Sequence, residues 1–247
     1  MTSDKLTGGN SNQVYREGDT VVRQCGIWSP FVHALLNFLV DAGFEASPRL
    51  IESDGKTERL TYIVGSVGND PLQPEMLTDA VLVEAAQLLR RFHDVTQAFV
   101  IPSDARFMLA VPDDVPREVI CHNDFAPYNC VYHGGHIVGI IDFDTVALGS
   151  RLWDIAYAVY RFVPLMTDAH CRDMGWHIPP NRISRLQQFC DAYGLDNRQQ
   201  LIDTVCRRIT ALMTYMQETQ SNLDHLPFYE TDLAYIRANQ AQFERLI

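Results

Sequence analysis

The sequence predicts an α+β fold in which a small antiparallel sheet precedes a mainly helical region. Residues 5–64 hold short strand-like segments, separated by turn signals, with one helix among them. Residues 117–145 again have the pattern of strands, and from about residue 150 the apolar residues recur at helical spacing. Strands and helices gathered in separate parts of a chain are typical of an α+β fold.

The N-terminal part is expected to form two hairpins with a helix between them. Ser29 and Pro30 begin the helix, with Ser29 as its N-cap, and Gly43 ends it. The two hairpins have turns at Glu17-Gly18-Asp19 and at Asp54-Gly55. Their four strands are predicted at residues 13–16, 20–24, 49–51 and 59–64.

The remainder of the chain is expected to be mostly helical, with three short strands before residue 145. Glycines at 65 and 68 suggest a lobe boundary, so we expect an N-terminal lobe at 1–64 and a C-terminal lobe at 65–247. The strands are predicted at 119–121, 130–132 and 136–141, and the helices near 78–93, 152–163, 182–193, 197–217 and 229–246.

Length and composition exclude several classes of protein. The 247 residues allow one large domain or two small lobes, and 47% hydrophobic with 21% charged residues argues against disorder. A net charge of −11 makes a nucleic acid or an anionic membrane an unlikely partner, and mildly favours cationic ones. No run of 18 apolar residues and no apolar leader are visible, and the six cysteines are scattered. We therefore expect a cytoplasmic protein with reduced thiols, and the sequence does not fix its oligomeric state.

The residues that carry chemistry lie between 119 and 144. His122-x-Asp124-x-x-x-x-Asn129 is followed by Asp142, which comes after an apolar strand. Phosphoryl transfer on a kinase-type scaffold needs these groups in this order, because one aspartate orients the acceptor hydroxyl and takes its proton. An asparagine and a second aspartate then supply the hard oxygen ligands that Mg²⁺ prefers.

With these residues in view, the chain resembles the aminoglycoside phosphotransferase and choline kinase-like family. The resemblance runs from about residue 5 to 165 and includes a glycine-containing turn, a basic strand residue and Ile141-Asp142-Phe143-Asp144. It ends with Gly149-Ser-Arg-Leu-Trp-Asp154-Ile-Ala. The resemblance implies a bilobal protein-kinase-like fold with a small antiparallel-sheet N-lobe and a mainly helical C-lobe. By the same resemblance the N-lobe at 1–64 is expected to bind the nucleotide, and the C-lobe at 65–247 is expected to be the catalytic and acceptor-binding lobe. It also implies Mg²⁺-dependent transfer of the γ-phosphate of ATP, or of GTP, to a hydroxyl of a small molecule, which the acidity suggests is cationic.

By this resemblance each motif residue has an expected role. Asp124 is the catalytic base, Asn129 and Asp142 are the Mg²⁺ ligands, and Asp144 is an auxiliary metal or substrate residue. His122 and Asp154 brace the catalytic loop. The residues expected to bind the nucleotide are Gly8, Gly9, Asn10, Ser11 and Asn12 over the phosphates, Arg23 on the α- and β-phosphates, and Tyr62 and Ile63 in the hinge at 61–64.

Two departures from the family pattern leave a second hypothesis open. The basic strand residue is Arg23, where the family more often has lysine. The helix that follows has no glutamate to pair with this cation, its only acid is Asp41 at the far end, and His33 is the nearest polar residue by position. The alternative is therefore a degenerate kinase that binds nucleotide without turnover.

A third hypothesis is a zinc-binding protein. Cys130-x-x-His133-x-x-His136 has a spacing that zinc ligands use, with Cys121 and His122 nearby. We expect instead that Cys130 faces the interior and that His133 belongs to the turn at Gly134-Gly135.

Overall fold

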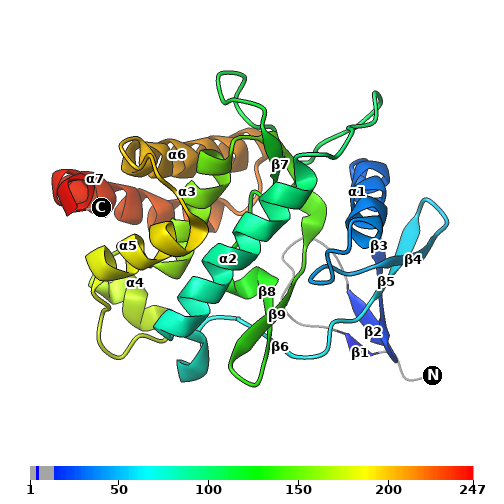
Figure 1. Ribbon diagram of the computed structural model, residues 1–247, viewed down its shortest axis with the longest axis horizontal. Helices are drawn as coiled ribbons and strands as arrows, with labels where there is room; N and C mark the ends of the chain where they lie inside the picture. The colour runs from blue at the N-terminus through cyan, green and yellow to red at the C-terminus, as the bar shows by residue number, and fades with distance from the viewer. Residues whose placement is uncertain (1–3, 6–13, 247) are drawn as a thin grey trace.

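The computed structural model describes residues 4–5 and 14–246. Figure 1 shows a bilobal molecule, with a sheet and one helix at one end and a cluster of helices at the other. The short strands of two further sheets lie between them. The predicted α+β class is confirmed, and so is the order of a strand-rich part before a helical part.

The N-terminal sheet has five antiparallel strands in the order β1-β2-β3-β5-β4. In its centre, β3 pairs with β5 so that Arg23 lies directly opposite Glu58. Both predicted hairpins are present, but the last strand ends at Thr61 rather than at residue 64. The strands are Asp4–Lys5, Tyr15–Glu17, Thr20–Gln24, Leu50–Ser53 and Thr57–Thr61 for β1 to β5.

Helix α1 (Ser29–Asp41) packs its apolar face on the interior, as its spacing predicts. The expectation that Ser29 is the N-cap is wrong, because Trp28 holds that position and makes no side-chain capping bond. Ser29 is the first helical residue, and its hydroxyl accepts a hydrogen bond from the backbone N–H of Gly26 at 3.0 Å. Gly43 follows the helix with φ +73°, a left-handed conformation that glycine adopts without strain.

The helical part is built on α2, which packs along α5, and on α3, which packs against α6. The interior between them holds fully buried aromatic rings, among them Phe92, Phe125 and Phe143. Helix α4 is not predicted by the sequence, because six residues are too few to show a helical period. The helices are α2 (Asp79–Thr96), α3 (Arg151–Phe162), α4 (Asp168–Asp173), α5 (Arg182–Tyr193), α6 (Leu201–Thr219) and α7 (Leu226–Leu246).

Two small sheets stand at the junction of the two parts and frame the motif residues. One has the order β6-β8-β9 and the other pairs β7 with β10. In the part of the chain that the structure describes, no helix is long and apolar enough to cross a membrane. The strands are β6 (Ser66–Val67), β7 (Val119–Cys121), β8 (Cys130–His133), β9 (His136–Ile140) and β10 (Ala147–Gly149).

Candidate active site

The β8–β9 hairpin brings the two halves of the motif together. Asn129 directly precedes β8, and one residue, Ile141, separates Asp142 from the end of β9. The backbone N–H of Ile141 donates to the carbonyl of Asn129 at 2.9 Å, which closes the open end of the hairpin. Antiparallel pairing therefore places the two expected metal ligands at the same end of this hairpin.

Both carboxylate oxygens of Asp124 accept hydrogen bonds. Its Oδ1 accepts from the hydroxyl of Tyr128 at 2.5 Å, and its Oδ2 accepts from Nδ2 of Asn129 at 2.8 Å. Burial raises the pKa of Asp124 to about 6. A carboxylate that titrates close to neutral pH is suited to accept a proton from a hydroxyl and to release it again.

The oxygens beside Asp124 suit a hard divalent cation. Asn129 donates its Nδ2 to Asp124, so its remaining side-chain atom, Oδ1, is the one left to act as a ligand. Asp142 adopts a left-handed backbone conformation with φ 62°, and its side chain is 47% exposed. An amide oxygen and an accessible carboxylate are the donors that Mg²⁺ takes in kinase-type sites.

Arg23 connects the N-terminal sheet to this acidic group. Its Nη2 donates to Asp144 at 2.7 Å, its Nη1 lies 3.4 Å from Asp142, and its Nε donates to Glu58. Burial alone would lower the pKa of Arg23, but the negative charges of Asp144, Glu58 and Asp142 outweigh it and raise the pKa. The guanidinium is thus held charged among three carboxylates.

Glu58 supplies the acid that the helix lacks. It lies opposite Arg23 in the β3–β5 ladder, is 2% exposed, and also accepts from Nε2 of His33 in α1. Burial alone would raise the pKa of Glu58, but His33 and Arg23 lower it. Glu58 was not predicted from the sequence, because the acid that pairs with Arg23 was expected in the helix that follows β3. The signal was available, since Glu58 alternates in phase with the buried Leu60 on β5.

Asp154, at the start of α3, holds the backbone of residues 122–124, called the catalytic segment here because it contains the expected base. Its Oδ2 accepts from the backbone N–H of His122 at 2.7 Å, and its Oδ1 accepts from that of Asn123 at 2.8 Å. Nε2 of His93 donates to it at 3.0 Å. Burial alone would raise the pKa of Asp154, but the hydrogen bond and charge of His93 lower it. The sequence did not reveal His93, which lies on the buried face of α2.

The ring of His122 is packed in the core rather than in the site. Its Nε2 donates to the carbonyl of Ile141 at 3.1 Å, while its Nδ1 has no hydrogen-bond partner among the residues that the structure describes. The rings of Phe92, Phe125 and Phe143 surround it. Burial lowers the pKa of His122 to about 4, so the imidazole is neutral at physiological pH.

Tyr128 and Tyr157 were not singled out in the sequence. The hydroxyl that Tyr128 donates to Asp124 is itself 2.7 Å from the hydroxyl of Tyr157 on α3. The guanidinium of Arg161 lies over the Tyr128 ring, 5.2 Å from its centroid. The two tyrosine hydroxyls therefore extend a chain of hydrogen bonds from the carboxylate of the expected base.

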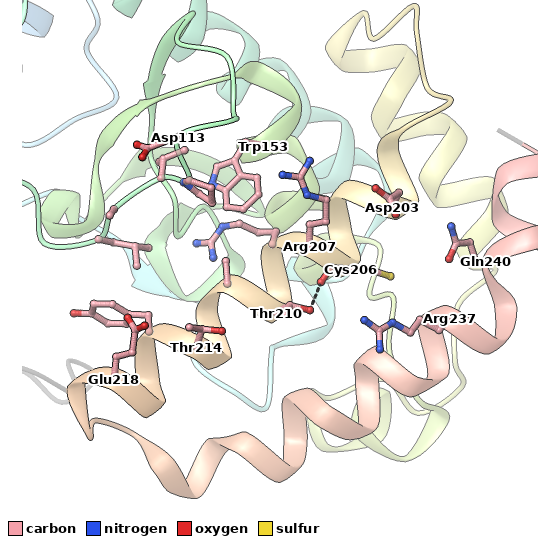
Figure 2. A pocket seen from close by; sticks show the side chains of 17 residues that line it. Asp113, Trp153, Asp203, Cys206, Arg207, Thr210, Thr214, Glu218, Arg237 and Gln240 are labelled. Carbon is pink, nitrogen blue, oxygen red and sulfur yellow. Dashed lines mark hydrogen bonds between the residues drawn. The ribbon is translucent and has the colours of Figure 1, made fainter.

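A cavity of about 700 Å³ lies between the segment 109–113, the start of α3, and helices α6 and α7. Figure 2 shows this cavity with Trp153, Arg207 and Arg237 among its labelled lining residues. Arg208 also lines it, is 2% exposed, and donates from Nη2 to the carbonyl of Asn123, the residue before Asp124. The cavity is thus linked to the catalytic segment by one buried side chain.

The nucleotide-binding residues expected from the sequence are only partly in view. Gly8, Gly9, Asn10, Ser11 and Asn12 lie outside the described residues. The expected hinge joins the five-stranded sheet to β6, and the backbone N–H of Tyr62 in it donates to the carbonyl of Asp19 at 2.8 Å. Ile63 packs against Gly139 on β9, where an added Cβ would lie 2.6 Å from the isoleucine side chain.

The zinc hypothesis based on Cys130, His133 and His136 is wrong. Cys130 and His133 are three residues apart on β8, so their side chains point to opposite faces of the strand. Cys130 is fully buried, whereas Nδ1 of His136 lies 2.6 Å from a carboxylate oxygen of Glu84. Among the described residues, the one group with metal-ligating side chains close together contains none of these three.

Comparison with known proteins supports the same assignment. Residues 100–201 match the model of the phosphotransferase enzyme family, a span that includes the catalytic segment and Asp154. A curated relative, the trifolitoxin immunity protein of Rhizobium leguminosarum bv. trifolii, is 28% identical over 196 residues, which cover 78% of this chain and 75% of the relative.

Solved structures share the fold over almost the whole chain. An ethanolamine kinase of Plasmodium vivax superposes with a TM-score of 0.65 at 13% identity, covering 98% of this chain and 84% of that one. The choline kinase LicA of Streptococcus pneumoniae gives 0.63 at 14%, covering 96% and 94%. The aminoglycoside phosphotransferase APH(2'')-IIa, in its complex with gentamicin, gives 0.63 at 14%, covering 100% and 93%. Over residues 100–201 this chain is therefore similar to the phosphotransferase enzyme family, and over almost its whole length it shares the fold of these kinases and phosphotransferases.

Proposed function

We propose that the protein transfers the γ-phosphate of ATP or GTP, with Mg²⁺, to a hydroxyl of a small molecule. The observation that carries this proposal is the joint placement of Asp124, Asn129 and Asp142. The asparagine bonds to the base through its nitrogen, which leaves its oxygen for a cation beside the carboxylate of Asp142. The N-terminal lobe at 1–64 would bind the nucleotide, with residues 8–12 over the phosphates and 61–64 at the base.

In this mechanism Asp124 orients the acceptor hydroxyl and accepts its proton at Oδ1. The Tyr128 hydroxyl now donates to that oxygen, so the acceptor hydroxyl replaces it there. Glu58 holds Arg23 in place, so the guanidinium lies next to Asp142 and Asp144, where the phosphates would lie. Asn129 and Asp142 would hold the Mg²⁺, which when bound neutralises charge on the phosphate oxygens and orients them.

Asp154 and His122 act at one remove from the reacting atoms. The two backbone hydrogen bonds to Asp154 fix the conformation of residues 122–123, and thereby the position of Asp124.

The acceptor itself is the open part of the proposal. The solved structures that share the fold include an ethanolamine kinase, a choline kinase and an aminoglycoside phosphotransferase. Together with the net charge of −11, they favour a cationic hydroxyl compound as the acceptor.

The donor site is tested by thermal unfolding with ATP and with GTP, each with and without Mg²⁺. A nucleotide at a hundred times its dissociation constant should add about 2.7 kcal/mol, or about 5–10 °C for a chain of this size. Asp142→Asn should remove the Mg²⁺-dependent part of the shift. Asp113→Asn, at a fully exposed carboxylate, is the matched control and should leave it intact.

Turnover is tested separately with Asp124→Asn. If the protein is an enzyme, slow hydrolysis of the bound nucleotide is lost in this variant while the Mg²⁺-dependent thermal shift remains. Nucleotide binding with no hydrolysis in the unchanged protein, and no transfer to choline, ethanolamine or an aminoglycoside, would instead support the degenerate-kinase alternative. Absence of any nucleotide shift rejects both.

A second candidate function is protection against a toxin. The observation that favours it is the 28% identity to a trifolitoxin immunity protein over 78% of this chain. The test is survival of a trifolitoxin-sensitive strain that expresses this chain or its Asp124→Asn variant. Protection by the unchanged chain alone indicates phosphoryl transfer, equal protection by both indicates binding without transfer, and protection by neither rejects this candidate.

A further inference from the structure

Three side chains with metal-ligating atoms converge where α1 meets the N-terminal sheet. Cys25 directly follows β3, His33 lies in α1, and Glu58 lies in β5. One ligand atom from each lies within 4.8 Å of the other two. This is the one such group of three among the residues described, and its members are not those that the sequence spacing suggested.

The strand ladder explains why they meet. Glu58 lies opposite Arg23, and residues directly opposite in an antiparallel pair project from the same face. The ladder continues past β3, because the backbone N–H of Cys25 donates to the carbonyl of Lys56 at 2.8 Å. Cys25 is two residues beyond Arg23 and so returns to that face. Helix α1 crosses the same face, and His33 contacts Glu58 through Nε2.

We propose that Cys25, His33 and Glu58 form a Zn²⁺ site. A thiolate, an imidazole and a carboxylate are the side-chain ligands that zinc uses, and three of them leave a fourth position open for water. Binding displaces the proton on the Cys25 sulfur, which is released to solvent, and the His33 nitrogen that now bonds to Glu58 exchanges its proton for the metal, with the neutral imidazole keeping one proton on Nδ1.

The surroundings favour a cation at this position. Glu58, Asp142 and Asp144 carry three negative charges around the single positive charge of Arg23. The two oxygens of Glu58 already divide their roles, since Oε1 faces Arg23 and Oε2 faces His33. One oxygen can therefore bind the metal while the other keeps its hydrogen bond to Arg23, an outer contact of the kind that orients metal-binding carboxylates.

Cys25 is also accessible, unlike the other cysteines. Five of the six are buried, and Cys25 is the partly exposed one. Its sulfur lies 3.5 Å from the hydroxyl of Ser53, which positions the thiol without enclosing it. The thiolate makes this site softer than the all-oxygen site of Asn129 and Asp142, so Mg²⁺ does not compete for it. The site does not depend on the proposed phosphoryl transfer, since binding is its only requirement.

The test is a titration of the full-length, metal-free protein with Co²⁺, a spectroscopic substitute for zinc. We expect one Co²⁺ per chain, with the absorption band of thiolate-to-cobalt charge transfer, and loss of the band when Zn²⁺ is added. Cys25→Ser should abolish the band. Cys206→Ser, at a thiol on α6, should keep it. His33→Gln should weaken binding at least about tenfold, the loss that removing even an outer partner of a ligand causes.

The variants are chosen so that a negative result is informative. Cys25 is partly exposed and its sulfur lies beside the hydroxyl of Ser53, so Cys25→Ser leaves Arg23, Glu58 and His33 in place. Circular dichroism and unfolding of this variant should match those of the unchanged protein. A charge-transfer band that survives in Cys25→Ser, or no band in the unchanged protein, overturns the proposal.

Discussion

Glu58 on β5 and Arg23 on β3 face each other across one rung of the N-terminal sheet, and this pair takes the place of a strand–helix ion pair. The arginine then reaches Asp142 and Asp144 at the far side of the junction. A cation fixed in this way by the sheet itself needs no acid from α1. Arg23 therefore has a buried carboxylate partner although α1 contains no glutamate.

Glu58→Gln should weaken the buried pair with Arg23 and so lower the unfolding free energy of the protein. The change removes one buried charge and keeps the shape, and Arg23 retains its two aspartate partners, so we expect a loss of about 1–3 kcal/mol in unfolding free energy. Glu52→Gln is the control, because Glu52 on neighbouring β4 forms an exposed pair with Arg59 that contributes about 0–1 kcal/mol. Denaturant unfolding measures both. Equal losses would show that the buried pair contributes no more than a surface one.

Tyr128→Phe should increase the hydrolysis of bound nucleotide. The phenol hydroxyl occupies Oδ1 of Asp124, the oxygen that an attacking hydroxyl or water must reach. Its removal frees that oxygen, and one hydrogen bond to a charged group corresponds to a rise of about tenfold. Tyr132→Phe is the matched control, since the Tyr132 hydroxyl is buried and has no hydrogen-bond partner. A rate for Tyr128→Phe at or below that of the unchanged protein would contradict a blocking role.

Asp154→Asn should be strongly destabilising. The carboxylate accepts two backbone hydrogen bonds and pairs with His93 at a fully buried position, so an amide places N–H groups against donors. Breaking a buried pair of this kind costs about 3–5 kcal/mol. Asp94→Asn provides the comparison, because Asp94 is 46% exposed in its pairs with Arg90 and Arg151. Chemical denaturation of the two variants side by side decides whether the buried position matters.

The part of the protein's stability that comes from His122 should fall as the pH falls from about 6.5 to about 4, whereas Asp124, whose pKa burial raises to about 6, contributes in the opposite sense over much of this range. Burial lowers the pKa of His122 from 6.5 to about 4, so across this window the unfolded chain binds a proton that the folded chain does not. The full contribution, on the order of 3 kcal/mol, is present above pH 6.5 and lost below pH 4. Urea unfolding at pH 7 and pH 5 measures the difference.

His122→Gln should remove the contribution of the imidazole, so the unfolding free energy of this variant should fall less, or rise more, between pH 7 and pH 5 than that of the unchanged protein. His225→Gln is the control for loss of a histidine, because that side chain is 43% exposed. If the two variants keep the same pH dependence as the unchanged protein, the buried imidazole is not its source.

Local sequence patterns predict the order of the elements and single out the residues of the motif. Periodicity and turn residues are local properties, so the hairpins, α1, α2 and the last three long helices could be predicted within a few residues. The motif from His122 to Asn129, with Asp142 and Asp154, is likewise a matter of residue type and spacing. Errors fell at element ends, such as the N-cap of α1, where one hydrogen bond decides the boundary.

Which residues come into contact depends on how the elements pack against one another. Glu58 reaches Arg23 through strand pairing, and Tyr128 reaches Asp124 through the shape of a loop. Cys25 and His33 approach Glu58 because α1 crosses one face of the sheet. The contacts of Glu58 with Arg23, Cys25 and His33 join residues from separate elements. Sequence spacing carries no information about the register and packing that bring such elements together. Spacing alone pointed instead to Cys130 and His133, which alternation along β8 turns to opposite faces.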